Sequence, residues 1–186
     1  MKNHTLVVTL RDRPGVLNRA VSMFRRRGYN IASLTVGHAE KSGISRMTLV
    51  VESEDVEQVA KQLYRLVDVH RVEDVTDEQV VEREMMLIRV KASGSQRAEV
   101  ASLAEVFRCK VVDVDHAMMM LEMTGAPGKL DSFIDLVRPF GIVEMMRTGR
   151  ITMVRGLSLG KDSGFRNEEA VFATPAAEPV HLAGAS

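Results

Sequence analysis

The chain has 186 residues, 45% of them hydrophobic and 27% charged, a balance typical of a soluble globular protein. Its 25 Lys and Arg residues equal its 25 Asp and Glu residues, and this zero net charge argues against a strongly basic nucleic-acid-binding protein. A single cysteine, Cys109, excludes an internal disulfide, and neither a signal-like start nor an apolar run of about 18 residues occurs, so we expect a cytoplasmic protein that does not enter a membrane.

The first half of the chain is predicted to contain four strands and two helices. Alternating apolar and polar residues indicate a strand at about His4–Leu10, and apolar residues at helical spacing indicate a helix after it. Asp12 is the candidate N-cap of that helix, Pro14 suits its first position, and Gly28 ends it. The elements expected next are a strand at Ile31–His38, a loop at Ala39–Ile44, a strand at Ser45–Val51, a helix from Val56 to Leu66 and a strand at Val69–Val75.

The same order of elements is expected again in the second half. Its predicted elements are a strand through Met86 and Val90, a helix from Val100 to Phe107, two strands flanking Asp115 and His116, a helix from Leu130 to Val137 and a strand at Gly141–Met146. We therefore expect one fold used twice, with a domain at residues 1–76, a charged linker at 77–83 and a domain at 84–159. Residues 160–186 lack periodicity and are rich in Gly, Ala, Pro and acidic residues, so we expect a disordered tail there.

Two short strand-helix-strand-strand-helix-strand units predict the α+β class, as two tandem ferredoxin-like domains. Each would be an antiparallel sheet with both helices on one face and an open face opposite. On one interpretation of the alternation, Val7, Val36 and Val50 point to the open face of the first domain, which is too apolar for water alone. We therefore expect this unit to form a dimer with a second copy, either edge to edge or face to face.

The turn between the first strand and the first helix, Asp12–Leu17, is a candidate binding site. A helix N-terminus offers unpaired N–H groups and the positive end of the helix dipole, which suit a carboxylate or a phosphate. Gly15 would let a ligand approach the backbone, Asp12 could meet an ammonium group, and Val16 and Leu17 could meet an apolar side chain. These groups describe an amino-acid zwitterion, although the same residues also describe a well-capped helix start without any ligand.

Asn30 and Ile31 are the second part of this candidate site. Together with Tyr29 they lie just before the second strand, which is an edge strand in the predicted topology. If two copies pair along that edge, Asn30 of one copy can approach the Asp12–Leu17 turn of the other. The ligand would then lie between two chains.

Other polar residues do not form a catalytic or metal-binding pattern. Asp113, Asp115 and His116 have no further ligands at useful spacing, so we assign no metal site. Cys109 has no basic helix start beside it to activate it, and a buried thiol is the better interpretation. Because the chain has no nucleophile–base pair and no Gly-rich dinucleotide fingerprint, we assign no catalytic residues.

Several segments together resemble a known family. They are "LRDRPGVLNRAVSMFRRRGYNIASLTVG", "SRMTLVV", "LYRLVDVHRVEDV", "VEREMMLIRVKASG" and "GKLDSFIDLVRPFGIVEMMRTGRI". The chain from about residue 1 to 156 is similar to the small, regulatory subunits of acetolactate synthase (acetohydroxyacid synthase), whose N-terminal unit is an amino-acid-binding ACT domain. The start "D-x-P-G-x-L" is shared by ACT domains in general, whereas "RRGYNIASL" together with "VERE" favours this family.

The resemblance implies a non-catalytic subunit that binds valine, or a related branched-chain amino acid, between two N-terminal domains. The family's ligand loop falls on Asp12, Gly15, Val16 and Leu17, and its partner-chain asparagine falls on Asn30, with Ile31 beside it. Many members have Asn where this chain has Asp12, which cannot donate a hydrogen bond when ionised, and Ala32 replaces a commonly acidic residue. Thiamine diphosphate, magnesium and FAD belong to the large subunit, so the resemblance assigns no cofactor to this chain.

The expected partners are a second copy of the chain and the catalytic large subunit, with no nucleic acid. The resemblance implies that the role of this chain is feedback control of branched-chain amino-acid synthesis. The alternative is a free-standing amino-acid sensor that regulates another enzyme.

Nine of the twelve Met residues lie at or after Met85. Flexible Met surfaces suit a contact between the second domain and the catalytic chain, although core filling explains part of these Met residues. Ser93-Gly94-Ser95, the equivalent turn of the second domain, lacks the Asp-x-x-Gly pattern, so we expect no amino acid there.

Overall fold

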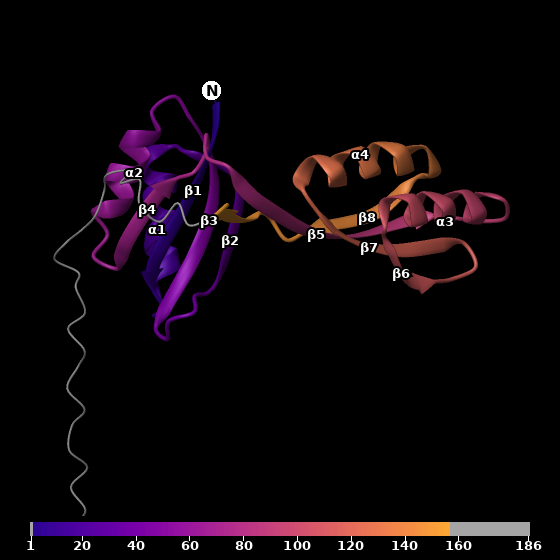
Figure 1. Cartoon of the computed structure of the whole chain (residues 1–186), viewed down its shortest axis with the longest axis horizontal. Helices are drawn as coiled ribbons and strands as arrows, with labels where there is room; N and C mark the ends of the chain where they lie inside the picture. The colour runs from indigo at the N-terminus through magenta and orange to yellow at the C-terminus, as the bar shows by residue number, and fades with distance from the viewer. Residues whose placement is uncertain (1, 157–186) are drawn as a thin grey trace, which may run out of the picture.

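A computed structural model describes residues 2–156, which form two sheets, each with two helices (Figure 1). The first sheet and its helices comprise β1 (Lys2–Arg11), α1 (Val16–Arg27), β2 (Asn30–His38), β3 (Ile44–Ser53), α2 (Val56–Tyr64) and β4 (Val69–Asp74). The second unit comprises β5 (Val80–Lys91), α3 (Gln96–Phe107), β6 (Lys110–Val114), β7 (Met118–Gly125), α4 (Pro127–Val137), a 3₁₀ turn (Arg138–Phe140), β8 (Ile142–Arg147) and β9 (Ile151–Val154). The tail expected at 160–186 lies outside the described residues.

Both sheets have the predicted split topology. The strand order is β2-β3-β1-β4 in the first sheet and β6-β7-β5-β8 in the second, and every strand pair is antiparallel. The helices of each unit pack on one face, where each forms a separate apolar core with its sheet (Figure 1). The predicted α+β class with two tandem ferredoxin-like units is therefore confirmed for the described residues.

The start of α1 differs from the prediction. The helix begins at Val16, so Pro14 lies outside it, and the N-cap position is Gly15 at φ +83° instead of Asp12. No side chain caps this end of the helix. Only glycine adopts this left-handed conformation readily, and it turns the chain sharply from β1 into the helix. The predicted end at Gly28 is confirmed, since its N–H bonds to the carbonyls of Phe24 and Arg25.

A two-stranded arm formed by the start of β5 and by β9 crosses from the second unit onto the first (Figure 1). Residues 80–83, which fall within the expected linker, pair with β9 in this arm, and β9 was not among the predicted strands. Arg46 on β3 donates a hydrogen bond to the carbonyl of Thr152 in β9, at 3.2 Å. The arm therefore lies against the face of the first sheet that is opposite to α1 and α2.

This arm corrects our expectation about the open face of the first sheet. Val7 and Val50 do point to that face, yet each is only 1% exposed. The same chain covers them, so they do not need a second copy for their burial. Val36 points the other way, since it pairs with Met47, a core residue on the helix side of the sheet.

Thr152 gives a stability prediction for the arm. It is fully buried, and its hydroxyl oxygen has no hydrogen-bond partner among the described residues. A buried hydroxyl without a partner costs about 1–3 kcal/mol, so Thr152→Val is expected to raise stability by about 1 kcal/mol, or roughly 2–4 °C in Tm. Thermal unfolding would measure this change. Thr148→Val is the control, because the Thr148 hydroxyl accepts a hydrogen bond from the Met85 N–H and its loss should lower Tm.

Candidate functional site

The Asp12–Leu17 turn joins β1 to α1 at one end of the first sheet. The Gly15 carbonyl accepts the first regular helical hydrogen bond from the Arg19 N–H, at 3.0 Å. Val16 is buried in the core of the first unit, so it is placed to shape the turn, whereas Leu17 is 40% exposed. Of the two apolar residues predicted to meet a ligand side chain, Leu17 alone presents its side chain to the surface.

Asp12 has a partner that sequence reasoning missed. Its Oδ2 lies 3.0 Å from Nδ1 of His38, at the end of β2, and both side chains are largely exposed. Its backbone N–H bonds to the carbonyl of Gly43, which fixes the position of the residue. An ammonium group that binds the Asp12 carboxylate would therefore share it with the imidazole of His38.

Arg19 and Asp68 add a second pair of charges to the turn. An ideal Cβ built on Gly15 would lie 3.4 Å from Nη1 of Arg19, so the guanidinium is directly beside the glycine. Nη2 of Arg19 bonds to the buried carboxylate of Asp68, which precedes β4. The spacing of four residues from Gly15 to Arg19 on one helix could have identified the arginine, whereas Asp68 is distant in sequence and only the fold brings it here.

Asn30 and Ile31 lie at the other end of the same sheet. The register pairs Arg11 with Ile44 and His38 with Ser45 near the turn, but it pairs Asn30 with Glu52 at the far end. Asn30 is exposed and Ile31 packs against the core. A single chain therefore does not bring the two parts of the candidate site together.

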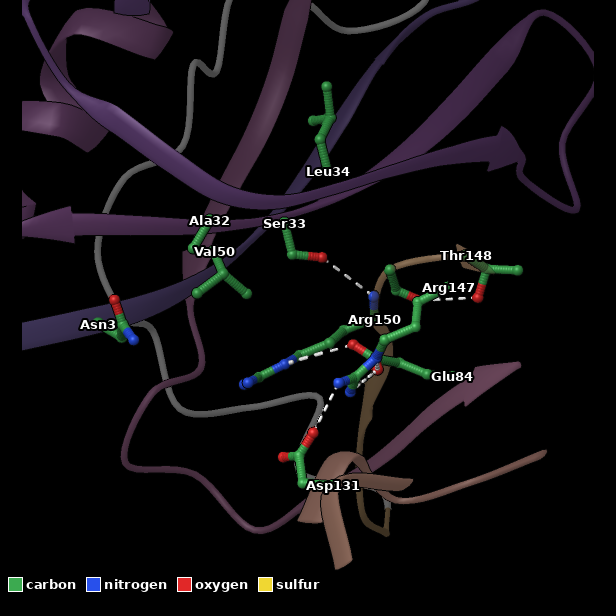
Figure 2. Close-up of a pocket in the computed structure, with 11 residues that line it drawn as sticks. Asn3, Ala32, Ser33, Leu34, Val50, Glu84, Asp131, Arg147, Thr148 and Arg150 are labelled. Carbon is green, nitrogen blue, oxygen red and sulfur yellow. Dashed lines mark hydrogen bonds and ion pairs between the residues drawn. The ribbon is translucent and has the colours of Figure 1, made fainter. Parts of the chain in front are cut away.

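A pocket of about 440 Å³ lies between the two units (Figure 2). Arg147 lies between two acidic residues, donating through Nε to Glu84 at 2.7 Å and through Nη1 to Asp131 at 2.6 Å. Burial alone would lower the pKa of Arg147, but the hydrogen bonds and charges of Glu84 and Asp131 outweigh it and raise that pKa above its ordinary value. Arg150 projects into the same pocket, with Nε at 3.7 Å from Glu84. Sequence reasoning singled out none of these side chains as functional.

Other candidates have local roles. Hydrogen bonds from the N–H groups of Ala117 and Met118 lower the pKa of Asp115, whose carboxylate thus stabilises the turn between β6 and β7. Burial raises the pKa of Cys109, which is partly buried, to about 11, so its thiol is protonated at neutral pH. Residues 2–156 contain no group of three or more His, Cys, Asp or Glu side chains placed to hold a metal ion, and no helix in that range is both long and apolar enough to span a bilayer.

Two family models match the chain, one on each unit. The model described as "AHAS small subunit-like ACT domain" matches residues 6–71, and "Small subunit of acetolactate synthase" matches residues 83–156. The start of the second match coincides with the part of β5 that lies in the arm.

Two named relatives, one archaeal and one bacterial, match over most of their length. The probable acetolactate synthase small subunit of Archaeoglobus fulgidus is 49% identical over 155 residues, which cover 82% of this chain and 97% of that protein. The acetolactate synthase small subunit of Bacillus subtilis is 44% identical over 154 residues, 81% of this chain and 90% of that protein. Among solved structures, the acetolactate synthase small subunit of Thermotoga maritima superposes with a TM-score of 0.76 at 37% identity, covering 84% of this chain and 99% of the other.

Proposed function

The chain belongs to the family of acetolactate synthase small subunits, and from this premise we propose that it activates a catalytic large subunit and makes it sensitive to valine. The proposed site is formed by two chains. Asp12, Gly15 and Leu17 of one chain would bind the amino acid together with Asn30 of the other. Thiamine diphosphate, magnesium and FAD would bind the large subunit, in the cytoplasm.

The register of β2 carries the two-chain proposal. β2 is an edge strand, and His38 at its end contacts Asp12, whereas Asn30 is at its start. When two copies of such a strand pair antiparallel about a two-fold axis, the start of each strand meets the end of the other. Asn30 of the second chain would thereby reach the His38–Asp12 end of the first, which one chain alone cannot achieve.

The groups around the turn suit a small amino acid. The first N–H groups of α1 and the guanidinium of Arg19 favour a carboxylate, and the Asp12 carboxylate favours an ammonium group. Leu17, at 40% exposure, offers an apolar contact of the size of a branched side chain. Such a ligand inhibits the holoenzyme only if it binds one state of it better than another.

Three measurements test this function. Calorimetry with valine on the purified chain, followed by a valine titration of the reconstituted holoenzyme, should give binding and inhibition over the same concentration range. A pull-down from cell extract should retrieve a thiamine-dependent large chain. Valine binding without such a chain would favour the alternative, a free-standing amino-acid sensor, and the absence of valine binding would reject the proposed effector.

We further propose that the open face of the second sheet contacts the catalytic subunit. Leu87 pairs with Met146 and Arg89 with Glu144 across β5 and β8, and with Met120 these side chains line a hollow of about 190 Å³. Met146 is 73% exposed. No described residue covers this face, in contrast to the face of the first sheet, which the arm covers.

Charged substitutions on this face should weaken activation. In the double variant Leu87→Glu with Met146→Glu, we expect the small-subunit concentration for half-maximal activation to rise at least about tenfold, because each side chain would place a charge in an apolar contact. Both residues are exposed, so stability should change by no more than about 0.5 kcal/mol. Val106→Glu, on the exposed side of α3, is the matched control. Activation equal to that of the control would exclude this face from the contact, and a change in dimer mass would assign it to self-association instead.

A further inference from the structure

The two units approach each other closely at Gly149, in the loop between β8 and β9. An ideal Cβ on this glycine would lie 2.6 Å from Oγ1 of Thr35 and 2.9 Å from Oγ of Ser33, both on β2. Its φ is +83°, a conformation that glycine adopts readily. A side chain at this position would therefore force either the Ser33 and Thr35 hydroxyls to turn away or the loop to move from β2, and either change would disturb the contact between them.

Hydrogen bonds on both sides of Gly149 hold this loop against β2. The Thr35 hydroxyl donates to the carbonyl of Thr148 at 3.2 Å, and the N–H of Arg150 donates to the Ser33 hydroxyl at 3.2 Å. Figure 2 shows Ser33 above the backbone of Arg150, with the side chains of Arg147 and Arg150 below it. We call Ser33, Thr35 and Gly149 the coupling joint.

Hydrogen bonds and strand pairing also attach the loop to the second unit. The side chain of Arg147, two residues before Gly149, bonds to Glu84 on β5 and to Asp131 on α4. On the other side, β9 pairs with the start of β5. A displacement of the loop would thus be passed to a strand and a helix of the second unit.

Ser33 and Thr35 of the coupling joint lie on β2, the strand that carries Asn30 of the proposed effector site. β2 begins with Asn30 and Ile31, and the register shifts between Ile31 and Ser33, immediately before the joint. The Ser33 and Thr35 hydroxyls contact the loop directly, and because protein interiors are close-packed, a shift of β2 at these residues is expected to displace the loop. Local irregularities of this kind are where a strand can change its twist.

We propose that the coupling joint transmits effector occupancy from β2 to the second unit and so links binding to inhibition. This inference rests on the proposed function, in which valine binds at the β2 edge. It assigns Ser33, Thr35 and Gly149 as positioning residues that lie outside the effector site. Their role is the relative placement of the two units.

The variant Gly149→Ala tests this role, and Gly156→Ala is its matched control. Gly156 has the same left-handed conformation, at φ +70°, but a Cβ there would meet no atom of the described residues within 4 Å. Both variants carry the backbone strain, but only in Gly149→Ala does the new Cβ meet the Ser33 and Thr35 hydroxyls and disturb the contact between the loop and β2. In Gly149→Ala we expect valine to bind within about threefold of its normal Kd, while the coupling factor, about 5- to 150-fold in typical allosteric proteins, falls towards one.

Three readouts separate the outcomes. Calorimetry gives valine binding, a titration of the holoenzyme gives inhibition, and amide hydrogen exchange reports on residues 147–154 with and without valine. Valine should slow exchange in 147–154 of the normal chain and of Gly156→Ala, but not of Gly149→Ala. Inhibition and exchange in Gly149→Ala that match those of Gly156→Ala would overturn the proposal.

Two provisions keep the test decisive. If Gly149→Ala does not fold, the double variant Ser33→Ala with Thr35→Ala removes the hydroxyl partners without adding volume, and the same loss of coupling is expected. If valine does not bind the normal chain, the effector proposal fails on its own. The coupling joint is then tested by amide hydrogen exchange without ligand. Exchange in residues 147–154 should be faster in Gly149→Ala than in Gly156→Ala. Equal exchange rates in the two variants would reject the proposed role of the joint.

Discussion

A holoenzyme that carries Gly15→Asp in its small subunit is expected to escape inhibition by valine. The new carboxylate would lie at the start of α1, where we place the carboxylate of the effector. At an effective dielectric constant near 20, two like charges about 4 Å apart repel by roughly 4 kcal/mol, which corresponds to roughly a 10³-fold loss of affinity. This exceeds the 1–3 kcal/mol that is typical of allosteric coupling, so a valine titration should show almost no inhibition.

The control for Gly15→Asp must account for the backbone. Gly15 is at φ +83°, so any substitution strains the turn whether or not a ligand binds there. Gly94→Asp, in the equivalent turn of the second unit, introduces the same charge at φ +56°, where a Cβ would meet no described atom within 4 Å. We expect comparable backbone strain with normal inhibition. Should Gly94→Asp abolish inhibition equally, strain at such a turn would explain both results and the Asp12–Leu17 turn would be only a helix start.

The sheet order and the two-unit organisation could be predicted because they follow from local periodicity. Strands such as His4–Leu10 alternate, and the helices between them repeat at helical spacing. β9 could not be predicted in this way. It has four residues, and its partners, Val80 to Arg83, are far from it in sequence. The arm that contains β9 lies on the face to which Val7 and Val50 point. Because β9 could not be predicted, the expectation that this face is open was wrong.

The candidate site was predictable only as far as local sequence determines it. Pro14-Gly15 signals a turn, but a capping residue such as Asp12 and a left-handed glycine such as Gly15 both explain how a helix can begin there. The fold decides between them, because the Asp12 carboxylate contacts His38 on β2. The partnership of Arg19 with Asp68 likewise needs the tertiary structure, although the position of Arg19 beside the glycine does not.

Breaking the cluster in the pocket between the units should have the largest effect on stability. Arg147→Leu would leave Glu84, which is 5% exposed, without the two hydrogen bonds that it accepts from the guanidinium. Removing one partner of a buried ion pair typically costs about 3–5 kcal/mol, and we expect about 3 kcal/mol because Arg147 is itself partly exposed. Arg150 in its present position cannot supply these hydrogen bonds, because its Nε is 3.7 Å from Glu84, beyond hydrogen-bond distance.

Urea unfolding of three variants would separate this cause from lost packing. Arg138→Leu is the control, because Arg138 forms an exposed ion pair with Asp135 at 3.3 Å, and such pairs contribute about 0–1 kcal/mol. The double variant Arg147→Leu with Glu84→Gln removes the uncompensated charge, so it should recover a substantial part of the loss. If Arg147→Leu is no more destabilising than Arg138→Leu, the cluster behaves as a solvated surface pair. If the double variant recovers nothing, the lost packing of the Arg147 side chain, and not the charge on Glu84, holds the second unit to the arm.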